Sequence, residues 1–94
     1  MSIEVLATLE VPAEQREQVL DVFRREATEV RAEPGCEQYA LYTSGDQRII
    51  LIERWLDNDS INAHAAGAPY HRLIDGVAAL TPNQLVIEFL TPVG

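Results

Sequence analysis

Two hydrophobic periodicities follow each other along this chain in an order that few folds share. Alternation with a period of two, typical of a strand with one buried face, covers residues 3–11, 36–43, 48–56 and 84–91. Apolar residues three and four positions apart, typical of amphipathic helices, mark residues 13–31 and, after a break, the stretch that ends at Leu80. The order β-α-β-β-α-β is the split βαβ arrangement of ferredoxin-like folds. We therefore predict an α+β fold with a four-stranded antiparallel sheet and helices on one of its faces.

Turn-forming residues separate these segments. Pro12 ends the first strand and is well placed to begin a helix. The turn at 44–47, which contains a glycine, joins the second and third strands as a β-hairpin. Residues 57–60, Asp-Asn-Asp-Ser, offer N-caps for a short helix. Gly67 can close this helix before Pro69 begins the next one.

The amount of apolar surface predicts a partner. A chain of 94 residues suits one domain, which we place at residues 1–94, and so small a domain buries only about 60–65% of the surface that its unfolded chain exposes. Yet 47% of the residues are hydrophobic, and the strands carry apolar residues on both faces. A second copy that packs sheet on sheet would cover the excess. We expect a homodimer.

Charge excludes two classes of partner. The formal net charge is −8, and the seven basic side chains are all arginines. No basic stripe could neutralise a phosphate backbone, so we expect no binding to nucleic acid, and an anionic membrane surface would repel the chain. No apolar run approaches the roughly 20 residues that span a bilayer, and acidic rather than basic residues occupy the N-terminus. We expect a cytoplasmic protein.

A lone cysteine raises the question of thiol chemistry. Cys36 cannot form an intramolecular disulfide, and a catalytic thiol needs a base or a positive charge that lowers its pKa. Its neighbours in sequence are Gly35 and Glu37, and a carboxylate raises the pKa of a thiol. Free cysteine also behaves as a small buried apolar residue. We interpret Cys36 as a packing residue at the start of a strand.

Two histidines are the candidate catalytic residues. His64 lies three positions after Ile61 on the predicted short helix, on the side that faces the interior, and histidine is the side chain most easily poised as a base near neutral pH. A packing role, with the ring bonded to a backbone carbonyl, is the alternative. His71 lies near the start of the next helix and is the reserve base, with a surface position as its alternative. We predict no metal site, because no ligand pattern supports the two histidines.

Three further residues are candidate substrate contacts. Trp55 and Glu53 share one face of the third strand. Buried tryptophan usually packs in a core, but the ring could also stack on a flat aromatic ligand. Tyr39 on the second strand is the third candidate. Tyr39 and Tyr42 point to opposite faces of that strand, so at most one of them lines a given cavity. Glu53 stands among apolar residues, where an ionised carboxylate needs a partner. An arginine partner is the simplest interpretation, and a role as a pocket acid is the alternative.

Three motifs resemble one known family. They are EPGCEQYALY at Glu33–Tyr42, ERW at Glu53–Trp55 and SINAHAAGAPYHRL at Ser60–Leu73. In that order and spacing they are similar to the turn and strand, the strand end and the histidine-bearing helix of the antibiotic biosynthesis monooxygenase domain, a dimeric α+β barrel. The resemblance covers nearly the whole chain. The turn TSGDQR at 43–48 is shorter than in many members.

The resemblance implies a function as well as a fold. Two chains would pair through their sheets, and each would keep a pocket between its sheet and its helices. Several members oxidise hydroquinones or polyketide anthrones with O₂ and without flavin, haem or metal. We therefore expect a cofactor-independent monooxygenase that acts on a small aromatic substrate, with His64 or His71 as the base. The glycines are isolated, so no G-x-G-x-x-G loop indicates a nucleotide cofactor.

Other members of the family leave alternatives open. Some degrade haem, for which His71 could ligate the iron, although the first strand lacks the asparagine that haem-degrading relatives commonly carry there. Some isomerise small phosphorylated metabolites. A dimer that binds a small hydrophobic molecule without catalysis is the alternative from a different class.

Overall fold

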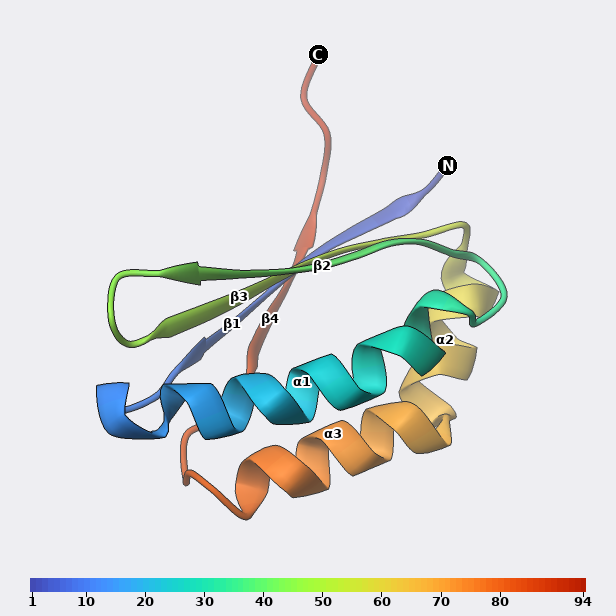
Figure 1. Ribbon diagram of the computed structural model, residues 1–94. Coiled ribbons are helices and arrows are strands. Elements are labelled where there is room, and N and C mark those ends of the chain that lie inside the picture. The colour runs from blue at the N-terminus through green and yellow to red at the C-terminus, as the bar shows by residue number, and fades with distance from the viewer.

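A four-stranded antiparallel sheet forms one layer of the molecule and the helices form the other (Figure 1). The structure is a computed structural model that describes residues 1–94. The strands are β1 (Ile3–Glu10), β2 (Cys36–Ser44), β3 (Arg48–Trp55) and β4 (Val86–Leu90). The helices are α1 (Arg16–Arg31), which follows a short 3-10 turn at Ala13–Gln15, α2 (Asn58–Ala66) and α3 (Ala68–Ala78). In Figure 1, α1 and α3 lie side by side along one face of the sheet, and α2 lies at one end of it.

The sheet has the strand order β2-β3-β1-β4, and every neighbouring pair is antiparallel. The predicted order of elements and the ferredoxin-like α+β fold are therefore confirmed. The hairpin between β2 and β3 turns at Gly45, whose φ of 62° lies in the left-handed region that glycine adopts without strain. Because β1 and β3 are the central strands, their inner faces are the most enclosed part of the sheet.

The core lies between the inner face of the sheet and the apolar stripe of α1. Both halves follow the predicted periodicities, of two in β1 and of three and four in α1. The buried residues of these two elements are Val5, Ala7, Leu9, Val19, Leu20, Val22, Phe23, Ala27 and Val30.

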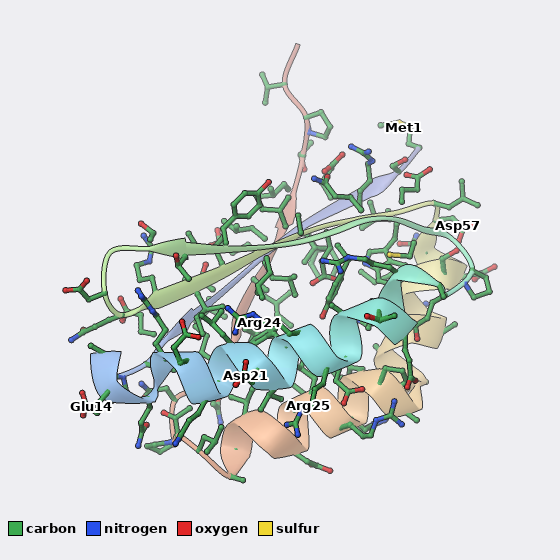
Figure 2. The ribbon with its side chains drawn as sticks, in the orientation of Figure 1. Met1, Glu14, Asp21, Arg24, Arg25 and Asp57 are labelled. Carbon is green, nitrogen blue, oxygen red and sulfur yellow. The ribbon has the colours of Figure 1, made fainter.

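The two long helices pack closely and keep their charged residues outside. A methyl group added at Gly76 of α3 would crowd Val22 of α1, so the absence of a side chain there allows the close approach. Asp21 and Arg24, both labelled on α1 in Figure 2, form an exposed ion pair. None of the helices is long and apolar enough to cross a bilayer.

A bulge in β2 brings two residues onto the inner face of the sheet. Cys36 and Gln38 pair with consecutive residues of β3, so Glu37 is the extra residue. Positions 36 and 39 are three apart and would point to opposite faces of a regular strand. With the bulge, Cys36 and Tyr39 both pack against the core.

The start of α2 is fixed by a side-chain cap and by the turn that precedes β2. The Asp57 carboxylate accepts hydrogen bonds from the Ser60 backbone N–H at 2.8 Å and from its hydroxyl at 2.7 Å, which confirms the predicted N-cap. Gly35, at a φ of 81°, packs on Ser60 and leaves no room for a Cβ. Gly67 ends α2 as expected. Its φ of −84° and ψ of 161° are extended rather than left-handed, because the chain passes directly into α3.

The outer face of the sheet carries apolar side chains on the side away from the helices. Leu6 lies opposite Ile52, and Ile50 is the neighbour of Thr8 in the next row. Tyr42 and Val86 end that row on the two edge strands and are 51% and 58% exposed. The whole of β4 is exposed. The predicted apolar character of both sheet faces is therefore present in the structure.

Candidate active site

His64 is an enclosed polar side chain of α2. The residue is only 5% exposed, and its ring packs against the inner face of the sheet. It stacks on the ring of Trp55, with centroids 4.5 Å apart and planes inclined by 28°. Tyr70 meets the imidazole edge-on, with centroids 5.4 Å apart. Aromatic rings on two sides therefore hold the imidazole in one orientation.

Glu33, which the sequence analysis does not single out as a site residue, lies at one ring nitrogen of His64. The distance between His64 Nδ1 and Glu33 Oε1 is 2.7 Å. Glu33 belongs to the turn between α1 and β2, and the packing of Gly35 on Ser60 brings this turn against α2. The motif EPG at 33–35 indicates the turn in the sequence. The residues around it do not indicate that Glu33 contacts His64 of α2.

Glu53 of β3 lies near the other ring nitrogen. Its Oε1 accepts a hydrogen bond of 2.9 Å from the Trp55 indole N–H and is 4.0 Å from His64 Nε2. Burial raises the pKa of the Glu53 carboxyl, and the charge of Glu33 adds to this, whereas the Trp55 hydrogen bond and His64 lower it. The residue is 6% exposed. The imidazole is thus flanked by two carboxyl groups.

The arginine partner expected for Glu53 is not there, so that interpretation of the sequence is wrong. Neighbouring residues of a strand point to opposite faces, and Arg54 accordingly lies on the outer face. It pairs there with Glu37 at 3.5 Å and with Glu4 at 3.9 Å. The partners of Glu53 are instead the Trp55 indole and His64.

A small apolar cavity opens beside His64 and Glu53. Its volume is about 140 Å³, and its walls come from β1, β3, β4, α2 and α3. The lining residues are Val5, Glu53, Ile61, Asn62, His64, Ala65, Tyr70, Ile87 and Phe89. A groove of about 370 Å³ runs between α3 and β4, and the cavity and the groove share Tyr70 and Ile87.

Of the three predicted substrate contacts, only Glu53 lines this cavity. Trp55 is fully buried behind the imidazole. Tyr39 is 4% exposed and meets the His64 ring edge-on at 6.1 Å. Its hydroxyl is buried without a hydrogen-bond partner. Burial raises the pKa of Tyr39 above its ordinary value. Both aromatic residues support His64 from the core side.

A family model assigns the chain. The model of the family named antibiotic biosynthesis monooxygenase matches residues 2–76. The chain belongs to the antibiotic biosynthesis monooxygenase family. Membership supports a function of the antibiotic biosynthesis monooxygenase type.

Solved structures share the fold over almost the whole chain. Rv0793 from Mycobacterium tuberculosis has a TM-score of 0.89 at 23% identity, with coverage of 100% of this chain and 97% of that one. A candidate antibiotic biosynthesis monooxygenase from Caulobacter crescentus has a TM-score of 0.89 at 27% identity, with coverage of 99% and 91%. PA3566 from Pseudomonas aeruginosa has a TM-score of 0.87 at 24% identity, with coverage of 99% and 95%. Comparison with curated proteins finds no match.

In this member of the antibiotic biosynthesis monooxygenase family, His71 lies outside the cavity. It is exposed on α3, and its Nδ1–H donates to the backbone carbonyl of Gly67 at 2.9 Å. It does not line the cavity, although the ring of the preceding residue, Tyr70, does. No three His, Cys, Asp or Glu side chains are arranged to hold a metal ion. His64 is therefore the histidine at the cavity wall.

Cys36 lies half-buried at the start of β2. Burial raises the pKa of its thiol, and the charges of Glu33 and Glu53 raise it further. The sulfur contacts the Gln38 carbonyl at 3.9 Å. This environment disfavours the thiolate and agrees with a packing role.

Proposed function

We propose that this chain is a cofactor-independent monooxygenase that oxidises a small aromatic substrate, of the hydroquinone or anthrone class, with O₂. The observation that carries the proposal is the placement of His64 and Glu53 at the wall of an apolar cavity, with 4.0 Å between Nε2 and Oε1. Two groups at that separation can both reach a single substrate hydroxyl. One can take its proton while the other donates a hydrogen bond to the oxygen left behind.

His64 is the proposed base. Its Nε2 edge lies on the side of Glu53, which lines the cavity, and a neutral imidazole is well suited to accept a proton near neutral pH. Loss of the proton from a phenol, or from the enol form of an anthrone, leaves an electron-rich anion. Such an anion can pass one electron to O₂, which is the step that the neutral substrate resists.

Glu53 is the proposed hydrogen-bond donor. Burial raises the pKa of Glu53 and so favours its protonated form. A protonated carboxyl group in an apolar site can donate to an oxygen on which negative charge develops. The Trp55 N–H already binds Oε1, so the other oxygen is free to carry the proton.

The proposed reaction balances with the substrate and O₂ alone. With an anthrone, the anion gives one electron to O₂, and the carbon radical and superoxide couple to form a C–O bond. Loss of the remaining hydrogen from that carbon, as a proton, breaks the O–O bond and creates the new carbonyl. His64 returns its stored proton to the departing oxygen, and the proton lost from the carbon completes the water molecule. One oxygen atom ends in the product and the other in water.

The size of the hollows favours a substrate larger than one ring. The cavity of about 140 Å³ is smaller than the roughly 300–1,000 Å³ of sites that hold drug-sized ligands. The adjoining groove of about 370 Å³ brings the space into that range. A ring system that starts at His64 would therefore extend past Tyr70 and Ile87 towards α3.

A homodimer is the proposed functional form. The outer face carries apolar side chains, with Ile50 and Ile52 near its centre, and strand β4 exposes Val86 and Phe89. Exposed apolar side chains gathered in this way are typical of protein–protein contact surfaces. A second copy packed sheet on sheet would cover it. This assembly is the one expected from the resemblance to the family.

Oxygen consumption tests the proposal directly. Menadiol and an anthrone serve as probes, and protein-free and heat-denatured samples measure autoxidation. Uptake well above both controls is the expected result. Binding of the probes without oxygen uptake would support the non-catalytic alternative. A Soret band after mixing with hemin would support haem degradation.

A further inference from the structure

The ring of His64 separates two hollows of the molecule. On its inner side lies the cavity that contains Glu53. On its outer side lies a surface hollow of about 390 Å³, lined by Glu33 and the first turns of α2. His64 is the one residue that lines both. The imidazole therefore lies between the two hollows, with Glu53 on the cavity side and Glu33 on the outer side.

The two carboxyl groups lie at different distances from the imidazole. Glu33 Oε1 is 2.7 Å from Nδ1, which is hydrogen-bonding distance, whereas Glu53 Oε1 is 4.0 Å from Nε2. An ionised carboxylate only accepts hydrogen bonds, so Nδ1 must carry the proton of the short contact. The lone pair of a neutral His64 then lies on Nε2, on the cavity side.

We propose that Glu33 is the positioning residue that makes His64 a base towards the cavity, an inference that rests on the function proposed above. Glu33 holds the Nδ1–H tautomer and stabilises the imidazolium that forms when Nε2 takes the substrate proton. In that step the substrate O–H bond breaks, the Nε2–H bond forms, and no electron leaves the protein. Without Glu33, a neutral imidazole can place its proton on Nε2, where it cannot accept another.

A contribution to folding stability does not by itself explain the contact between Glu33 and His64. Buried ion pairs are often no more stabilising than apolar residues of the same volume, and Glu33 keeps 19% of its side chain in contact with solvent. Fixing a tautomer, by contrast, requires an acceptor at Nδ1. The short contact supplies that acceptor on the side of the ring away from the cavity.

Nitrogen NMR of histidine-labelled protein tests the tautomer without any substrate. In the wild type with a neutral imidazole, we expect a protonated Nδ1 and an unprotonated Nε2 on His64. Glu33→Ala removes the acceptor, so the Nε2–H form should appear. Glu33→Gln keeps an acceptor without the charge and should preserve the wild-type tautomer. Asp59→Asn, which removes an acidic group from the same outer hollow, should leave the spectrum of His64 unchanged.

Kinetics with menadiol separate positioning from structural support. For Glu33→Ala we expect kcat to fall about 10- to 100-fold, by analogy with the carboxylates that orient metal-ligating histidines. KM should change little, because the cavity walls are intact. The kcat of Glu33→Gln should fall less than that of Glu33→Ala, and the kcat of Asp59→Asn should equal that of the wild type.

Three results overturn the role of Glu33. They are an Nε2–H tautomer in the wild type, an unchanged tautomer in Glu33→Ala, and an unchanged kcat in a folded Glu33→Ala protein. If Glu33→Ala does not fold, two results still test the role of Glu33. An Nε2–H tautomer in the wild type, or an unchanged kcat in Glu33→Gln, would contradict it. If the wild type consumes no oxygen with either probe, the proposed function fails, and the tautomer by itself decides whether Glu33 positions His64.

Discussion

The Nδ1 atom of His64 lies 2.7 Å from a carboxylate oxygen of Glu33, although 31 positions separate the two residues in the chain. The contact exists because the turn after α1 packs on the start of α2, where Gly35 meets Ser60. The geometry of the candidate site therefore depends on backbone packing outside the cavity.

Replacement of Gly35 by alanine should be more costly than replacement of Gly45. Both glycines have positive φ, 81° and 62°. In that region an alanine lowers the free energy of unfolding by about 1–2 kcal/mol relative to glycine. At Gly35 the added methyl also collides with Ser60, whereas nothing lies within 4 Å of it at Gly45. We expect Gly35→Ala to lose about 1–3 kcal/mol more than the Gly45→Ala control. Urea unfolding measures both, and equal losses would refute the close packing of the turn on α2.

Glu53→Gln should stabilise the protein at neutral pH. Burial raises the pKa of Glu53 above its ordinary value of 4.5, so the folded state binds that proton more tightly than the unfolded chain. The resulting stability is complete below pH 4.5 and is lost as the pH rises through the raised pKa. Glutamine stays neutral and keeps an oxygen for the Trp55 N–H. The free energy of unfolding of the variant, relative to the wild type, should therefore increase as the pH rises from about 4.5 through the raised pKa, by about 1.4 kcal/mol for each unit by which the pKa is raised.

The opposite result is expected if the groups around Glu53 stabilise its ionised form. They are Trp55, His64 and Glu33. If an ion pair with a protonated His64 dominated, Glu53→Gln would be less stable than the wild type at neutral pH. Urea unfolding at several pH values distinguishes the two cases.

The thiol of Cys36 should be unreactive and dispensable. Burial and Glu33 raise its pKa, so little thiolate exists at neutral pH. Reaction with a disulfide reagent should be slow at neutral pH and should accelerate at high pH. Cys36→Ser should retain oxygen uptake and lose about 1 kcal/mol of stability at most. Complete loss of uptake in a folded Cys36→Ser protein would show that the thiol takes part in the chemistry.

A charge on the outer face of the sheet should break the proposed dimer without unfolding the monomer. Ile52 lies on the face away from the helices, between Leu6 and Ala40 of the adjacent strands. Ile52→Glu places a carboxylate where a second copy would pack, at a cost of several kcal/mol for an unpaired buried charge. Thr28→Glu, on the exposed side of α1, is the matched control. Sedimentation at micromolar concentration should show a dimer for the wild type and control and a monomer for Ile52→Glu. A monomeric wild type would contradict the assembly.

Periodicity predicted the parts of the fold that local burial determines. The alternation over residues 3–11 identified the inner face of β1, and the spacing of apolar residues identified the buried side of α1. The side chains of residues 57–60 predicted an N-cap for α2, and the structure places this cap at Asp57. Each of these features depends on residues close together in the chain, and a sequence reports such features directly.

Contacts between distant segments could not be predicted in the same way. The bulge at Glu37 turns Cys36 to the same side as Tyr39, and nothing in the alternation of β2 requires it. The partner of Glu53 was expected to be an arginine because charge complementarity ignores geometry, whereas the structure supplies the Trp55 indole. The role of Glu33 depends on His64 of α2, 31 positions along the chain, so the residues next to Glu33 do not indicate it.

The rate of oxygen uptake by His64→Ala is the most direct test of the central proposal. If Nε2 of His64 takes the substrate proton, kcat with menadiol or an anthrone should fall roughly 10²–10⁴-fold, the usual range for one positioned acid–base group. Substrate binding should weaken far less, because the apolar walls of the cavity are unchanged. His71→Ala, whose side chain is exposed and outside the cavity, is the control and should keep the wild-type rate. A folded His64→Ala protein that consumes oxygen at the wild-type rate would contradict the proposal.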